Sequence, residues 1–228
     1  MLSFPNNYRA VARKSLAAIA QRLGFAEIAF GVISLFLAQP AFAHHPFGGG
    51  TPDNFIEGFL SGLGHPVIGL DHFAFVVAVG LLAVMRKKLG IIIPIAFTLA
   101  TALGTIIHLQ SIDLPIPEVM IALSVLTIGI ALAVQKDFNL ILLIILSGIA
   151  GVFHGFAYGE AIFGAEMTPL GAYLFGFMSI QLVVSAIAFY VGRVTLSKVA
   201  SNTSLALRLA GSAIAGIGIT FLSNAVLG

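Results

Sequence analysis

Cysteine is absent from the 228-residue sequence, so the chain can form neither a disulfide nor a thiolate metal site. Charge is also scarce: Asp, Glu, Lys and Arg make up 9% of the residues, against about 25% in soluble globular proteins. Hydrophobic residues account for 59%, and the mean hydropathy is +1.07. This composition predicts an integral membrane protein. Any metal must then be held by nitrogen and oxygen ligands, which suit nickel, cobalt, zinc or manganese.

Two further absences narrow the function. The sequence contains no P-loop, so we do not expect the chain to hydrolyse ATP itself. It also has neither a polybasic tail nor a soluble domain, and nucleic-acid binding is therefore not expected.

Residues 1–43 have the pattern of a cleavable secretory signal peptide. Basic residues (Arg9, Arg13, Lys14 and Arg22) precede an apolar run from Ile28 to Ala38, and Ala41-Phe42-Ala43 supplies the small residues of a cleavage site. An uncleaved signal anchor is the alternative, although the run is short for a span of about 20 residues. Cleavage would leave a domain of residues 44–228 that begins His44-His45. This pair is a candidate for metal capture, or is simply tolerated in a tail.

Six apolar segments follow, and each is long enough to cross about 30 Å of hydrocarbon as a helix. We predict transmembrane helices at residues 66–85, 89–109, 116–134, 139–157, 170–192 and 206–227. The fold class is therefore an all-α integral membrane protein with six transmembrane helices after a signal peptide. Small residues at Gly151/Gly155/Gly159 and Gly211/Ala215 predict close helix packing.

The basic residues that follow the signal peptide all fall in alternate connections. Arg86, Lys87 and Lys88 lie in the first connection, Lys136 in the third, and Arg193, Lys198 and Arg208 in or beside the fifth. The positive-inside rule places these connections in the cytoplasm. The mature N-terminus and the C-terminus are then both predicted on the periplasmic side of a bacterial inner membrane.

Histidines and carboxylates gather at the opposite, outer ends of the spans. His65, Asp71 and His72 lie in the first span, His108 ends the second, Glu118 opens the third, and His154 and Glu160 end the fourth. Ionisable groups within a membrane are costly and usually mark a functional site. One polar residue of the fifth span, Gln181, is interpreted as an interhelical hydrogen-bonding residue in preference to a pore contact.

The first span is predicted to be broken near its outer end. On a straight helix His65 and His72 would stand about 10 Å apart along the axis, too far to share one ion. Pro66 disfavours helix at His65 and suits a first helical turn, and Gly64 and Gly69 loosen the same region. The amphipathic segment before it, Asn54 to Gly64, is expected to lie on the outer surface or to enter as a half-helix.

Two ordered blocks resemble the HupE/UreJ family. The first is His65-(x)5-Asp71-His72, followed by an apolar span with Gly80. The second, residues 153–160, reads Phe-His-Gly-Phe-Ala-Tyr-Gly-Glu and is similar to the family's Phe-His-Gly-x-Ala-His-Gly-x-Glu. The resemblance covers essentially the whole mature chain. This sequence departs from the pattern at Tyr158, where many members carry a second histidine, and Glu160 is displaced by one position.

The resemblance implies a permease for nickel, or cobalt in some branches, that serves hydrogenase or urease maturation. It implies the metal-binding residues His65, Asp71, His72, His154 and Glu160. We assign His65, Asp71 and His72 to the main site, with His108 and Glu118 of second rank. No permanently bound cofactor and no enzymatic activity are expected: Ni²⁺ or Co²⁺ would be the transported ion. A homo-oligomer and an energising partner both stay open.

Three other functions compete with metal transport. An intramembrane zinc-dependent hydrolase could use the same His/Asp cluster. A transporter, unlike an enzyme, needs a route to the cytoplasm, yet the inner halves of the spans offer few polar residues: Ser124, Thr127, Ser147 and Ser185. A haem protein is disfavoured because no Arg lies on the outer side to pair with a propionate. Retinal binding is excluded because no span carries a lysine for a Schiff base.

Overall fold

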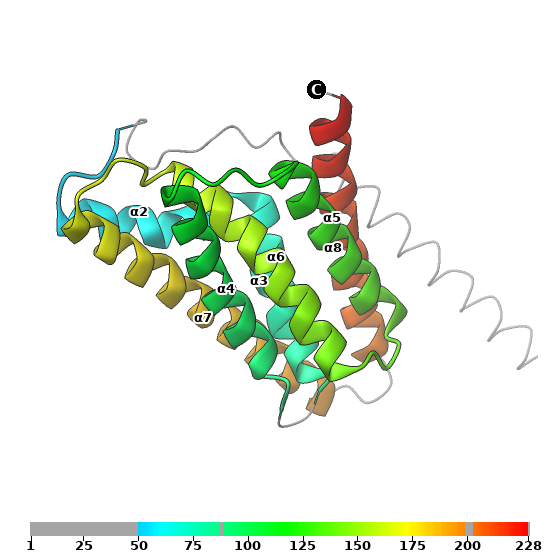
Figure 1. The fold of residues 1–228 in the computed structure, drawn as a ribbon. Helices are drawn as coiled ribbons and strands as arrows, with labels where there is room; N and C mark the ends of the chain where they lie inside the picture. Colours follow the sequence, from blue (N-terminus) through cyan, green and yellow to red (C-terminus); the bar gives the residue numbers. More distant parts are fainter. Residues whose placement is uncertain (1–49, 87–88, 199–202, 228) are drawn as a thin grey trace, which may run out of the picture.

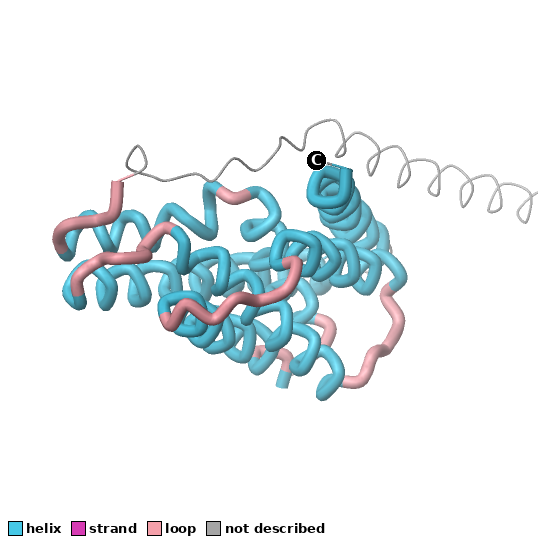
Figure 2. The backbone as a smooth tube through the Cα atoms, turned by 45° about the horizontal axis from the view of Figure 1, so that its top comes forward, coloured by secondary structure: helices cyan, strands magenta, loops and turns pink. Residues whose placement is uncertain are grey.

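The computed structural model describes residues 50–86, 89–198 and 203–227, and all secondary structure within them is helical (Figures 1 and 2). The described helices are α2 (Phe55–Ile68), α3 (Leu70–Val84), α4 (Ile92–Leu109), α5 (Pro117–Val134), α6 (Leu140–Glu160), α7 (Met167–Lys198) and α8 (Thr203–Leu227). The predicted signal peptide and the His44-His45 pair lie outside the described residues.

The helix lengths confirm the predicted membrane fold. Five helices, α4 to α8, are long and apolar enough to cross a membrane, and the pair α2 and α3 passes the same test together as one broken span. This pair is bent by 80° at the break. The chain is therefore a multi-pass membrane protein with up to six spans, as its hydropathy predicted.

The break in the first span lies later than the sequence indicated. Helix α2 starts at a cap where the Asn54 side chain accepts from the Glu57 backbone N–H at 3.0 Å, and it continues through His65 and Pro66. The expectation that Pro66 would open the helix was wrong. The chain leaves helical geometry at Gly69, where a Cβ would stand 2.7 Å from Cδ2 of His72, and so a larger residue would collide with that ring.

Packing against α7 explains why α2 extends so far. The two helices approach so closely that a Cβ at Gly58 would overlap the backbone of Pro169, and one at Gly62 would overlap the backbone of Tyr173. On the other side, a Cβ at Gly176 would lie 2.5 Å from the carbonyl oxygen of Phe59. Helix α2 therefore lies along the first half of α7 (Figure 1).

Close packing at glycine also joins two further helix pairs and confirms the predicted small-residue faces. Gly155 of α6 lies against Thr101 of α4, and Gly211 of α8 lies against Gly129 and Ala133 of α5. In each case a Cβ would collide with the neighbouring backbone. Close backbone approach of this kind is the usual way in which membrane helices pack without a hydrophobic driving force.

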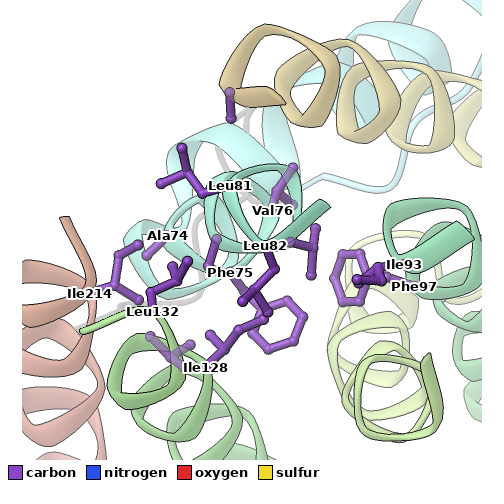
Figure 3. Close-up of a cluster of buried hydrophobic side chains, with 14 of the residues drawn as sticks. Ala74, Phe75, Val76, Leu81, Leu82, Ile93, Phe97, Ile128, Leu132 and Ile214 are labelled. Atoms are coloured by element: carbon purple, nitrogen blue, oxygen red, sulfur yellow. The ribbon is translucent and has the colours of Figure 1, made fainter. Parts of the chain in front are cut away.

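Helix α3 occupies the middle of the bundle. Its Phe75 and Leu82 are almost fully buried and belong to one apolar cluster with Phe97 of α4, Leu132 of α5 and Ile214 of α8 (Figure 3). Because α3 begins directly after the break at Gly69, this core fixes the position of its first turn. That turn carries Asp71 and His72.

The ends of the bundle differ in charge. At one end, Arg86 pairs with Asp137 and also approaches the backbone carbonyl of Lys136, which ties the α3–α4 connection to the α5–α6 connection. The C-terminal end of α7 and the N-terminal end of α8 lie at the same end (Figure 1). The helix ends that border the basic connections of the charge pattern thus lie at one end of the fold.

Candidate functional site

Three imidazoles meet where the broken span contacts α6. The Nδ1 atoms of His72 and His154 are 2.8 Å apart, although the residues are 82 positions apart in the sequence. The ring of His65, from the last turn of α2, has its centroid 5.8 Å from that of His72. His154 is fully buried, and His72 is 7% exposed. The break in the first span therefore brings a surface-proximal imidazole next to two buried ones.

Each end of this cluster is tied to a hydroxyl group. Nε2 of His154 lies 3.0 Å from Oγ of Ser124 on α5, and the same Oγ lies 2.7 Å from the carbonyl oxygen of Ile121. At the other end, Nδ1 of His65 lies 3.1 Å from the Tyr173 hydroxyl on α7. Helices α5 and α7 thus orient rings that α6 and α2 supply.

Asp71 lies at the break, in the first turn of α3. Its side chain is 8% exposed, and Oδ1 accepts the backbone N–H of His72 at 2.8 Å. A carboxylate in the first turn of a helix is favoured by the helix dipole. The same oxygen would stand 3.3 Å from a Cβ at Gly69, so the carboxylate lies beside the break. Asp71 therefore holds the start of α3 and adds negative charge next to the imidazoles.

The Tyr158 ring completes the cluster. Its centroid lies 4.9 Å from that of His65 and 4.8 Å from that of His72, with edge-on geometry in both cases. The side chain is fully buried. In the sequence, Tyr158 stands out only as a departure from the family pattern. Its position four residues after His154, on the same helix face, was the signal that it belongs to the site.

Comparison with known proteins identifies the family. A family model described as HupE / UreJ protein matches residues 32–221. The chain belongs to the HupE/UreJ family. It is also 30% identical, over 187 residues, to "Protein HupE" of Rhizobium leguminosarum bv. viciae, an alignment that covers 82% of this chain and 93% of that protein. No solved structure matches the chain.

Other residues predicted for the site of this HupE/UreJ protein lie apart from the imidazole cluster. Glu160 is exposed at the last position of α6, six residues after His154 and so about 120° around the helix from it. Glu118 is exposed in the first turn of α5. His108 packs edge-on against Phe156 and Phe163 near the end of α4, which is a structural role.

The predicted ligands do not form a complete coordination shell. Within the described ranges, no group of three or more His, Asp or Glu side chains is placed to hold a metal ion together. The five-residue ligand set of the HupE/UreJ pattern therefore stays a prediction. What the structure brings together is a pair, His72 and His154, with His65 and Asp71 beside it.

Gln181 has the interhelical role that its position favoured. It is fully buried on α7, and its Oε1 accepts a hydrogen bond of 3.2 Å from Thr101 of α4. Thr101 also donates to the carbonyl oxygen of Thr98 at 2.7 Å, which is the shorter of its two contacts. Gln181 therefore contributes to the packing of α4 against α7.

The two buried tyrosines of the site give a stability prediction. The Tyr173 hydroxyl contacts both the carbonyl oxygen of Tyr158 and Nδ1 of His65, whereas the Tyr158 hydroxyl makes no hydrogen bond of ordinary geometry with any described residue. We expect Tyr173→Phe to lower the free energy of unfolding by about 1–3 kcal/mol, because buried polar groups lose their partner. Tyr158→Phe removes an unpaired hydroxyl and is expected to be neutral or stabilising. Thermal unfolding of both variants in detergent compares them, and equal losses of stability would contradict this assignment of contacts.

Proposed function

We propose that this chain carries a divalent transition metal across the membrane, with Ni²⁺ as the main substrate and Co²⁺ as a second one. The observation that carries the proposal is the cluster of His65, His72 and His154 at a broken membrane span. Transporters commonly bind their ions at such discontinuities in helices. Imidazole and carboxylate ligands suit nickel and cobalt, and family membership agrees with a role in supplying hydrogenase or urease.

The incomplete ligand shell also supports transport. A transported ion must be bound strongly enough to enter a site but weakly enough to leave it. A hydrolytic zinc needs three protein ligands around one ion, with a position left for water. An incomplete set of imidazole and carboxylate groups fits an ion that is passed on better than one that is kept.

A cavity next to the cluster offers a route for the ion. It has a volume of about 170 Å³ and lies between α3, α5 and α6, with mostly apolar walls. Three of the four inner polar residues found in the sequence line it: Ser124, Thr127 and Ser147. Ser124 also contacts His154, so one wall residue of the cavity touches the imidazole cluster, and the walls reach Leu82 and Leu143 near the basic end of the bundle. This observation favours a transporter over the hydrolase alternative.

The direction of transport follows from the charge pattern. We propose that the acidic end of the bundle faces the periplasm and the basic end faces the cytoplasm, with the mature N-terminus and the C-terminus outside. The ion would then enter past Glu160 and Asp71 and leave at the basic end. A separate protein or an ion gradient would supply the energy.

Uptake of radioactive nickel by metal-depleted cells tests the proposal. Cells that produce the chain are expected to accumulate nickel faster than cells without it, and excess unlabelled cobalt should compete more strongly than excess zinc. The control is a chain of equal membrane abundance with His65, His72 and His154 all changed to alanine. Equal nickel accumulation in the presence and absence of the wild-type chain would rule out nickel uptake. Competition by zinc but not by cobalt would contradict the assignment of cobalt as the second substrate.

A further inference from the structure

The hydrogen atoms of the Ser124 hydroxyl and the His154 ring can be placed by counting donors. The Ser124 Oγ lies 2.7 Å from the Ile121 carbonyl oxygen, which can only accept. The single hydroxyl hydrogen must therefore lie between these two oxygens. Oγ also lies 3.0 Å from Nε2 of His154, and this contact then requires a hydrogen on Nε2. A neutral His154 is thus protonated at Nε2 and carries its lone pair on Nδ1.

This arrangement determines where the proton of His72 lies. The bare Nδ1 of His154 is 2.8 Å from Nδ1 of His72, so the His72 nitrogen must donate. The lone pair of a neutral His72 is then on Nε2. That nitrogen belongs to the ring edge that carries Cδ2, and this edge faces Gly69 at the break between α2 and α3. The metal-binding atom of His72 therefore lies on the side of the break, away from His154.

The same argument applies to His65 on the other side of the break. The Tyr173 hydroxyl donates to the carbonyl oxygen of Tyr158 at 2.8 Å, so it has no hydrogen left for the ring. Its contact of 3.1 Å with Nδ1 of His65 requires a hydrogen on that nitrogen. A neutral His65 is then also protonated at Nδ1 and carries its lone pair on Nε2. Two separate hydroxyl groups thus impose the same tautomer on two histidines.

We propose that Ser124, acting through His154, and Tyr173 are positioning residues that keep the protons of His72 and His65 on Nδ1 and so present their Nε2 atoms to the ion. His154 is in this arrangement the hydrogen-bonding partner of a ligand, with both of its ring nitrogens occupied. The inference rests on the proposed metal transport. Partners of this kind fix the tautomer and orientation of metal-binding histidines, and their loss commonly weakens metal affinity about 10- to 100-fold.

Nickel binding by the full chain in detergent gives the first test. Ser124→Ala is expected to raise the Kd for Ni²⁺ about 10- to 100-fold, because His154 loses the acceptor that holds its proton on Nε2. Ser124→Thr keeps the hydroxyl and should bind like the wild type. Ser185→Ala is the matched control, because Ser185 is also a buried serine whose hydroxyl donates to a carbonyl oxygen, that of Val76 at 3.1 Å, and it is not among the residues that line the cavity. An unchanged Kd in Ser124→Ala would overturn the role of Ser124.

Nitrogen NMR of protein with ¹⁵N-labelled histidine tests the tautomers without relying on transport. We expect protonated Nδ1 at His65 and His72 and protonated Nε2 at His154, with assignments from single His→Asn variants. Addition of Zn²⁺ as a diamagnetic probe should shift Nε2 of His65 and His72. A protonated Nδ1 at His154, or zinc bound directly to His154, would overturn the inference.

The two measurements separate this inference from the proposed function. If the wild type shows the expected tautomers but binds neither nickel nor zinc, the metal-transport proposal fails and the hydrogen-bond assignment stands. If the wild type binds nickel and Ser124→Ala binds it equally well, the positioning role of Ser124 fails and the transport proposal stands.

Discussion

His72→Ala is expected to abolish nickel uptake when the metal is scarce. The substitution removes the ring that connects His65 to His154 and leaves the Nδ1 of His154 without its partner. The rings of His65 and His154 cannot take its place, because the His65 ring already lies 5.8 Å from the position of the His72 ring. Nickel-dependent hydrogenase or urease activity in metal-limited cells measures the effect. Excess nickel should restore activity, because other uptake routes then supply the metal.

His108→Ala is the appropriate control for this experiment. His108 is the histidine at the end of α4, and its ring packs against Phe156 and Phe163 and not against the imidazoles of His65, His72 and His154. Its loss removes an imidazole from the same end of the bundle without touching the cluster. We expect the variant to retain most of its uptake. If His72→Ala, inserted at normal abundance, supports normal activity at limiting nickel, the assignment of the site is wrong.

Gly155→Ala is expected to destabilise the bundle by about 1–3 kcal/mol, the usual cost of overpacking a well-packed interface. The added methyl group would overlap the backbone of Thr101, which cannot move unless α4 and α6 separate. That separation would also disturb the hydrogen bond of 2.8 Å between the Thr105 hydroxyl and the Gly155 carbonyl oxygen. The yield of folded protein after heating in detergent, followed by size-exclusion chromatography, measures the loss.

Gly148→Ala provides a matched control on the same helix. Gly148 lies seven residues before Gly155 on α6, and among the described residues no atom outside the adjoining backbone of its own helix lies within 4 Å of the position that its Cβ would occupy. Alanine also has a higher helix propensity than glycine, by up to about 1 kcal/mol in exposed positions. We therefore expect Gly148→Ala to be neutral or slightly stabilising. Similar losses in both variants would show that the close contact between α4 and α6 is not what limits stability.

The membrane fold was predictable because its signals are local. Each span is a run of apolar residues, and helices are the structures that satisfy all backbone hydrogen bonds within one segment. The break in the first span was also predicted, but its position was not. Pro66 suggested a boundary at His65, whereas the helix ends at Ile68; α7 packs along α2 as far as His65, whose ring contacts the Tyr173 hydroxyl. Glycines four residues apart, such as Gly58 and Gly62, mark a helix face that packs closely, but they do not show which helix packs against it.

The candidate site was also predictable only in part. The charge pattern placed His65, His72 and His154 at one depth, and the structure brings them together. The sequence did not indicate that His154 would contact His72 through Nδ1 and Ser124 through Nε2, because this depends on the rotation of three helices about their axes. The same rotation turns Glu160 away from the rings and places Tyr158 against two of them. The depth of a side chain in the membrane can be predicted from its position in the sequence, whereas the direction in which it faces depends on how the helices pack.

The glycine contacts also have a mechanical consequence. They fasten α4 to α6 and α5 to α8 backbone against backbone, so each pair is expected to move as one stiff unit. The cavity beside His154 lies on the seam between these units, with α5 on one side and α6 on the other. Sliding along this seam disturbs flexible apolar side chains and leaves the glycine contacts intact. We therefore expect the gate that opens and closes the route to be a displacement of one helix pair relative to the other, with the bonded hydroxyl of Ser124 and ring of His154 meeting across it.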